Sequence, residues 1–179
     1  MMLHTIHFIC PVTTNSVSQL QNHCLAALSQ GATEINIHIS SRGGETDCGF
    51  AAYSFLKSLP IKVRTHNISN VESIANIIFL AGSERTANPE SRFLIHPLAW
   101  SFSGQVDHYR LRELVKCLDN DLNRFVNIFL DEVSHDIDWF STIEKSTVFT
   151  TEDAMNCGIV NIKKIAKLQP NGVNWYVSC

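Results

Sequence analysis

The sequence has 179 residues, of which 45% are hydrophobic and 17% are charged, and its formal net charge is −3. This length suits one domain with its own core, and the modest charge argues against a disordered chain and against a protein that coats nucleic acid. No apolar run reaches the roughly 18 residues of a membrane span, and the start lacks the pattern of a secretion signal. We therefore expect residues 1–179 to form a single cytoplasmic domain that binds neither nucleic acid nor a membrane.

Strand and helix patterns alternate along the chain. Short apolar stretches predict strands over residues 7–12, 35–39, 61–65, 92–96 and 159–162, and apolar residues alternate with polar ones over 35–39. Helical spacing and capping residues predict helices over residues 13–31, 50–59, 73–81, 105–133 and 151–156. The polar stretch between residues 66 and 72 is expected to be a loop. This alternation indicates an α/β fold with a largely parallel sheet.

The predicted helix over residues 105–133 is the longest element. Its apolar residues recur at helical spacing, from Leu111 through Phe125 to Val133. One small core does not need a helix of this length, so we expect part of it to pack on another subunit.

Six cysteines are present, but no two have the C-x-x-C spacing of a zinc site. We therefore expect reduced thiols, several of which fill the core as small apolar residues. His4 and His7 lie three residues apart among apolar neighbours, which favours a strand over a metal site. Neither a metal nor an organic cofactor is expected.

Ser73 stands at the start of a predicted helix. Local sequence alone favours an N-cap, whose side-chain oxygen accepts a backbone N–H. The alternative is a nucleophile, because the N–H groups and the positive dipole end of a helix stabilise an oxyanion. The surrounding residues do not form the G-x-S-x-G turn of another class of serine hydrolase.

His96 and the pair Gly43 and Gly44 are the other candidates. His96 ends an apolar strand, where it either supports the strand end or serves as a general base for a serine. The glycines either permit a tight turn or let the backbone approach a substrate closely. None of these signals is specific alone.

The order and spacing of these residues resemble one family. Ser-Arg-Gly-Gly at residues 41–44 follows a strand, Ser73 comes next, and Ser-Arg-Phe-Leu-Ile-His-Pro-Leu occupies residues 91–98. Gly49, Tyr53 and Pro60 fall in register, as does the segment TEDAMNCGIV at residues 151–160. Over most of its length the sequence resembles the proteolytic subunit of the caseinolytic (Clp) protease family. The resemblance implies the ClpP/crotonase superfold, an α/β fold of repeated ββα units with a protruding handle helix over about 105–133.

The resemblance also implies an activity and an assembly. Ser73 would be the nucleophile, His96 the general base, and the N–H groups of Gly44 and Ile74 the oxyanion hole. The substrate would be a peptide aligned by strand addition along residues 98–104, inside a ring-shaped homo-oligomer whose rings stack through the handle. Trp100 and Phe102 predict a different or narrower groove than the family form.

Several residues depart from the family pattern. Ser146 occupies the position expected for the catalytic aspartate, and a serine cannot stabilise the imidazolium by charge. Glu144 lies two residues earlier and would substitute if the loop shifts. Glu72 places a carboxylate beside Ser73, which disfavours an oxyanion unless its side chain points away. One residue is missing after His96.

Three hypotheses follow. The first is a Clp-like serine endopeptidase, and the second, favoured by Ser146, is a catalytically weak or inactive subunit with a structural or regulatory role in an assembly. The third is an acyl-CoA enzyme of the crotonase type, against which Ser73 and His96 fall on the peptidase positions. An ATP-dependent unfoldase and an active paralogue are the candidate partners. Because the first strand is expected almost at Met1, docking to an unfoldase through a preceding loop is not expected.

Overall fold

The fold is built on one eight-stranded sheet, with the order β6-β5-β3-β2-β1-β8, to which β4 is added beside β3 and β7 beside β4. The computed structural model describes residues 3–133 and 135–179. Every strand pair is parallel except β5 with β6, which is antiparallel. The strands are β1 (Leu3–Phe8), β2 (Glu34–Ser41), β3 (Lys62–Glu72), β4 (Glu84–Ala87), β5 (Arg92–Ile95), β6 (Thr147–Thr150), β7 (Ile162–Lys163) and β8 (Val173–Tyr176). The predicted α/β class with a largely parallel sheet is confirmed.

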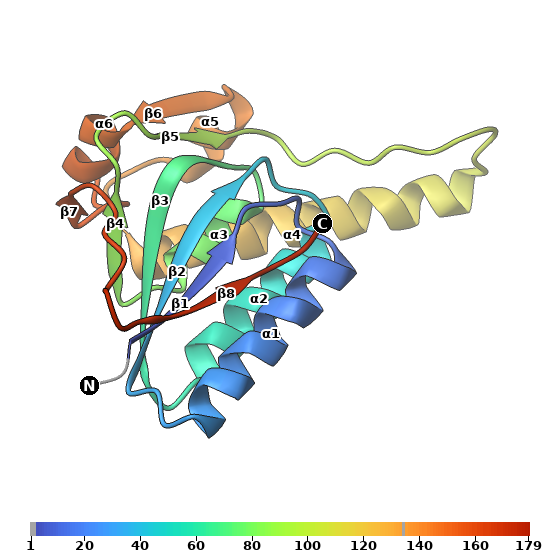
Figure 1. Ribbon diagram of the computed structural model, residues 1–179. Coiled ribbons are helices and arrows are strands. Elements are labelled where there is room, and N and C mark those ends of the chain that lie inside the picture. Colours follow the sequence, from blue (N-terminus) through green and yellow to red (C-terminus); the bar gives the residue numbers. More distant parts are fainter. Residues whose placement is uncertain (1–2, 134) are drawn as a thin grey trace.

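Helices α1 and α2 pack beside each other along β1 and β2, and α3 lies between the sheet and α4 (Figure 1). A capping box between Thr13 and Ser16 begins α1, and Gly31, in the left-handed region with φ 79°, follows its end. The helices are α1 (Thr14–Ser29), α2 (Thr46–Ser58), α3 (Ala75–Leu80), α4 (His108–Glu132), α5 (Trp139–Glu144) and α6 (Thr151–Asn156). None of the helices within residues 3–133 and 135–179 has the length and apolar character needed to cross a membrane.

Helix α4 projects from the body of the molecule, and the chain between β5 and α4 runs out beside it before turning into its first residue (Figure 1). Asp107 caps the start of α4 by accepting hydrogen bonds from two backbone N–H groups. Phe125 and Phe129 bury the other end of the helix, where Phe129 contacts the ring of Trp139. The handle predicted over residues 105–133 is therefore present and begins three residues later.

The second half of β3 was expected to be a loop, and that prediction is wrong. His66, Asn67 and Glu72 are buried there, and each has a hydrogen-bond partner. His66 Nδ1 pairs with the Thr86 hydroxyl at 2.6 Å, and Asn67 Nδ2 donates to the carbonyl of Arg92 at 2.9 Å. The strand consequently continues as far as Glu72, and the next residue is Ser73.

Other differences concern short elements. The sequence patterns missed β4, β6, β8 and α5, and the strand predicted over residues 159–162 is present only as β7, at residues 162–163. These strands have two to four residues each, too few for a period-two pattern to stand out. Pairing with a neighbouring strand defines them.

Candidate active site

Three segments predicted to carry chemistry meet at one edge of the sheet. Gly43 and Gly44 follow β2, Ser73 directly follows β3, and His96 directly follows β5. Strands β2 and β5 both pair in parallel with β3, so their carboxyl ends lie side by side. Loops at this edge of a parallel sheet are where ligands bind in many α/β proteins.

Ser73 has an unusual backbone conformation, with φ at +54° in the left-handed region. Its N–H donates to the carbonyl of Leu94 at 2.9 Å, and its own carbonyl accepts from Asn76 Nδ2 at 2.9 Å. Asn76 Nδ2 also donates to Leu94, so one buried amide ties the residue after β3 to β5. The main chain of Ser73 is thus fixed on both sides.

The side chain of Ser73 takes no part in the hydrogen bonds that fix its main chain. The N-cap of α3 is Ile74, which makes no side-chain capping bond, so the N-cap interpretation of Ser73 is wrong. Within residues 3–133 and 135–179, Ser73 Oγ has no hydrogen-bond partner. In particular, it does not bond to the imidazole of His96. The hydroxyl is therefore free to act on a ligand.

Two glycines let the backbone approach Ser73 and the chain after β1. A Cβ at Gly43 would lie 2.7 Å from Ser73 Cβ and 3.3 Å from its Oγ. At Gly44, where φ is +155°, a Cβ would lie 2.1 Å from the carbonyl oxygen of Val12. Only glycine fits either position without moving the backbone.

The N–H groups of Gly44 and Ile74 are the predicted oxyanion donors. Val12 fixes the turn around Gly44 by donating to the carbonyl of Gly43 at 2.9 Å and accepting from the N–H of Glu45 at 2.8 Å. Neither predicted donor bonds to an acceptor in the part of the chain that the structure describes. The Ile74 side chain lies against Gly49, where a Cβ would be 2.2 Å from its Cγ1. Both N–H groups are thus on well-anchored segments and remain available.

His96 is half-buried, and its Nδ1 lies 2.8 Å from the carbonyl oxygen of Pro97. A carbonyl oxygen only accepts, so Nδ1 carries the proton of the neutral ring and Nε2 is left as the basic nitrogen. In the described residues no carboxylate bonds to this imidazole. The backbone therefore selects the tautomer without supplying a negative charge.

Ser146 and Glu144 are the candidates for the third catalytic position. Strands β5 and β6 pair Ile95 with Thr147, and one further step of this antiparallel register places Ser146 across from His96. Ser146 is exposed, and its φ is +54°. Glu144 ends α5 and, with Pro97 and Leu98, lines a cavity of about 310 Å³. Both residues are therefore near the imidazole segment, although neither bonds to it.

Glu72, the carboxylate next to Ser73 in sequence, is paired. Its Oε1 accepts from Arg92 Nη2 at 2.8 Å and from Asn70 Nδ2 at 3.2 Å. Glu72 is buried and Arg92 is largely exposed, so the guanidinium lies between the carboxylate and solvent. The guanidinium thereby offsets the charge that would oppose an oxyanion at Ser73. Sequence reasoning missed this pair, although Arg92 belongs to the same motif, residues 91–98, as His96.

A groove opens beside Gly44, with a volume of about 780 Å³. Its walls are the start of α2, the outer part of α4 and the segment from Ala99 to Ser101. Segment 98–104, expected to align a peptide, is not paired with any described strand. Its main-chain groups are therefore available to an added strand.

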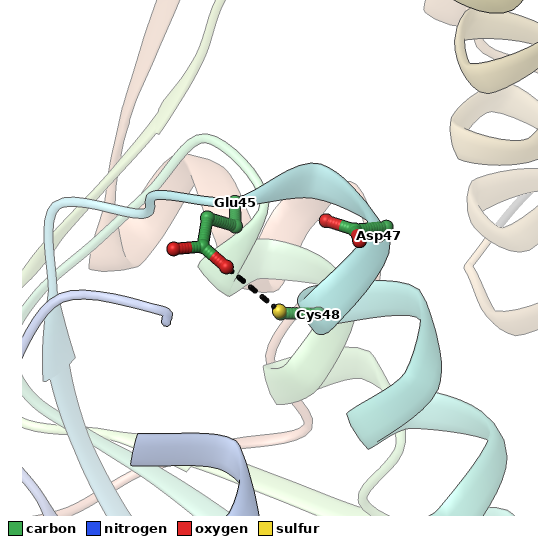
Figure 2. A group of neighbouring side chains, drawn as sticks. All are labelled: Glu45, Asp47 and Cys48. Atoms are coloured by element: carbon green, nitrogen blue, oxygen red, sulfur yellow. Dashed lines mark hydrogen bonds between the residues drawn. The ribbon is translucent and has the colours of Figure 1, made fainter. Parts of the chain in front are cut away.

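Glu45, Asp47 and Cys48 lie together at the start of α2, where the exposed Glu45 and Asp47 line this groove and Cys48 is half-buried (Figure 2). Glu45 accepts hydrogen bonds from the Cys48 thiol at 3.0 Å and from the N–H and hydroxyl of Thr14. These hydrogen bonds lower the pKa of the Glu45 carboxyl, and the bond from Cys48 has the largest effect. The described contacts of this carboxylate thus join the start of α2 to the first residue of α1.

His4 and His7 have packing roles in β1. His4 Nδ1 accepts from the indole N–H of Trp175 at 3.1 Å, and burial lowers its pKa. His7 stacks on Tyr176 and bonds to Asn174 at 3.0 Å. Both histidines therefore hold β8 against β1.

The sequence is similar to those of known proteins. The sequence profile described as Clp protease matches residues 2–167. The ATP-dependent Clp protease proteolytic subunit of Paracoccus denitrificans is 27% identical over 157 residues, which cover 84% of this chain and 76% of the relative. Proteolytic subunit 2 of the ATP-dependent Clp protease of Borreliella burgdorferi is 30% identical over 111 residues, or 58% of this chain and 56% of the relative.

The fold also matches a solved structure. A mutant of ClpP1 from Listeria monocytogenes superposes with a TM-score of 0.77 at 18% identity, covering 90% of this chain and 92% of that chain. This likeness confirms the predicted ClpP fold. Together with the profile match over residues 2–167, it leads to one conclusion: the chain belongs to the Clp protease family.

Proposed function

We propose that the protein is a serine-type endopeptidase that cleaves peptide bonds with Ser73 as nucleophile and His96 as general base. The observation that carries this proposal is the state of Ser73. Its main chain is fixed in a left-handed conformation, its hydroxyl is free, and the unused N–H groups of Gly44 and Ile74 lie on the adjoining segments. The names of the relatives, proteolytic subunits of Clp proteases, support the same activity.

The proposed reaction follows from the tautomer of His96. Nε2 takes the hydroxyl proton as Ser73 Oγ attacks the peptide carbonyl carbon, and the N–H groups of Gly44 and Ile74 stabilise the resulting oxyanion. The intermediate collapses when His96 returns the proton to the leaving amine. Water, activated by the same nitrogen, then hydrolyses the acyl-enzyme. The Pro97 carbonyl holds the ring during both steps but stabilises the imidazolium less than a carboxylate would.

We infer that the substrate peptide lies along the groove beside Gly44. Segment 98–104 supplies unpaired main-chain groups for strand addition, and Trp100 and Phe102 are about half-exposed on it. These rings restrict the space for substrate side chains. A peptide in this position would lie next to the hydroxyl of Ser73, and the carbonyl group of its scissile bond would point toward Gly44.

We also propose that α4 mediates assembly into a ring-shaped homo-oligomer. Leu111 and Val115, one helical turn apart on its outer half, are 47% and 49% exposed, while Phe125 and Phe129 anchor the inner half. An apolar strip on a projecting helix suits contact with a second copy of the chain. Cleavage would then take place in an enclosed chamber. The relatives are proteolytic subunits of ATP-dependent Clp proteases, and this supports an ATP-dependent unfoldase as the partner class that we propose.

A second candidate function is that of a catalytically weak or inactive subunit in a Clp assembly. Ser146 at the position across from His96, together with the carbonyl contact of Nδ1, favours it. Such a subunit would keep the fold and the protruding helix while turning over peptides slowly.

Hydrolysis of a fluorogenic peptide separates the two functions. We expect Ser73→Ala to lower kcat/KM by about 1000-fold or more, and His96→Ala by a similar factor. Ser18→Ala, an exposed serine on α1, is the matched control and should leave the rate unchanged. A wild-type rate no higher than that of Ser73→Ala would instead support the inactive subunit.

A further inference from the structure

Cys10 and Cys179 lie next to each other although 169 positions separate them. Strand β8 pairs in parallel with β1, and the last pair in the ladder is His7 with Tyr176. The Val177 N–H continues this ladder by donating to the His7 carbonyl at 3.0 Å. Three further steps of the same register bring Cys10 opposite Cys179.

The side-chain contacts agree with this register. Cys179 Sγ lies 3.7 Å from the carbonyl oxygen of Ile9, the residue before Cys10. Burial has the larger effect and the neighbouring Cys179 thiol the second, and together they raise the pKa of Cys10 to about 12. Neighbouring strands are about 4.8 Å apart, which is within the range of Cα separations that a disulfide spans.

The segment that carries Cys179 is held in place by α1. Gln19 Nε2 donates to the carbonyl of Ser178 at 3.1 Å, and its Oε1 accepts from the Ser178 N–H at 2.9 Å. This two-point contact fixes the backbone beside Cys179. The two thiols are thus kept in reach of each other while both remain free.

The two cysteines differ in exposure in a way that orders a reaction. Cys179 is exposed to solvent, whereas Cys10 is 5% exposed. A dissolved oxidant therefore meets Cys179 first, and the buried thiol beside it is placed to react second. Cys117 is also exposed, on α4.

We propose that Cys10 and Cys179 are a site of reversible oxidation, at which a peroxide converts the two thiols into a disulfide. Cys179 sulfur attacks one peroxide oxygen, which leaves a sulfenic acid and releases one water. The sulfur of Cys10 then displaces the sulfenic oxygen as a second water, and the S–S bond forms. Two thiols and one hydrogen peroxide thus give one disulfide and two waters.

The bond would tie β8 to the chain that supports the turn at Gly44. Pro11 and Val12 follow Cys10, and Val12 holds that turn through the carbonyl of Gly43 and the N–H of Glu45. A crosslink between residues 10 and 179 closes a loop of nearly the whole chain, which constrains the unfolded state strongly. Formation of this bond requires no peptidase activity.

Peptide mapping after oxidation tests the site. The folded protein is treated with hydrogen peroxide, remaining thiols are alkylated, and the digest is analysed by mass spectrometry. We expect a linked peptide pair containing Cys10 and Cys179, its loss after dithiothreitol, and a Tm higher by about 5–15 °C in the oxidised protein.

Two variants serve as controls. Cys179→Ser should abolish both the linked peptide and the Tm shift, while Cys117→Ser should keep both. Because both positions are exposed, neither change removes core packing. Alkylation of Cys10 and Cys179 after peroxide treatment, or a Tm shift that persists in Cys179→Ser, would overturn the proposal.

Discussion

Replacing Ser146 with aspartate is expected to raise kcat/KM for a peptide substrate by about two to four orders of magnitude. The β5–β6 register places residue 146 across from His96, so a carboxylate there would reach Nδ1 in place of the Pro97 carbonyl. It would stabilise the imidazolium that forms when Ser73 loses its proton. Aspartate also tolerates the left-handed backbone of this position better than most residues.

Two variants separate charge from shape in this experiment. Ser146→Asn has the same shape as the aspartate without its charge, and it should give little or none of the gain. Glu144→Gln tests the alternative partner at the end of α5. A rate unchanged by Ser146→Asp but lost in Glu144→Gln would assign the role to Glu144 and contradict the account given for Ser146.

Removing the Arg85 side chain is expected to lower the free energy of unfolding by about 3–5 kcal/mol. The guanidinium is buried and faces the Glu132 carboxylate at 3.9 Å. It donates to four backbone carbonyl oxygens, those of Gly82, Glu132, Gly158 and Ile159. Arg85→Ala would leave these buried carbonyl oxygens without this donor, whereas Glu132 would keep Lys57 at 2.7 Å and the Tyr53 hydroxyl at 2.6 Å.

Denaturant titration measures this loss, and two variants calibrate it. Arg85→Lys keeps the charge but not the planar fork of donors, so it should recover only part of the stability. Arg110→Ala removes an exposed pair with Glu113 and should leave the free energy of unfolding close to that of the wild type. Equal losses for Arg85→Ala and Arg110→Ala would show that the buried network contributes nothing beyond an ordinary surface pair.

The sequence allowed the helices to be predicted better than the strands. The capping residues of α1 and the apolar periodicity of α4 are local signals, and both helices lie where these signals place them. The second half of β3 was not predictable in this way, because His66 and Asn67 are buried through partners on β4 and β5. Short strands such as β8 depend on pairing with β1, which is distant in sequence.

In the candidate site, too, some residues were predictable from local sequence and others were not. Ser73, His96 and Gly44 could be identified from the order and spacing of motifs. Their supports could not, because these cross between strands. The ion pair of Glu72 with Arg92 and the amide bridge from Asn76 join β3 to β5. The Pro97 carbonyl contact of His96 depends on the turn after β5, where the family comparison predicted only a missing residue.

Labelling with a fluorophosphonate tests most directly whether Ser73 is an activated nucleophile. Folded protein is incubated with the probe, and the modified residue is identified by mass spectrometry. We expect one adduct, on the peptide that contains Ser73, and its disappearance in Ser73→Ala and after unfolding. Folded wild-type protein that stays unlabelled at Ser73, or an adduct that survives in Ser73→Ala, would contradict it.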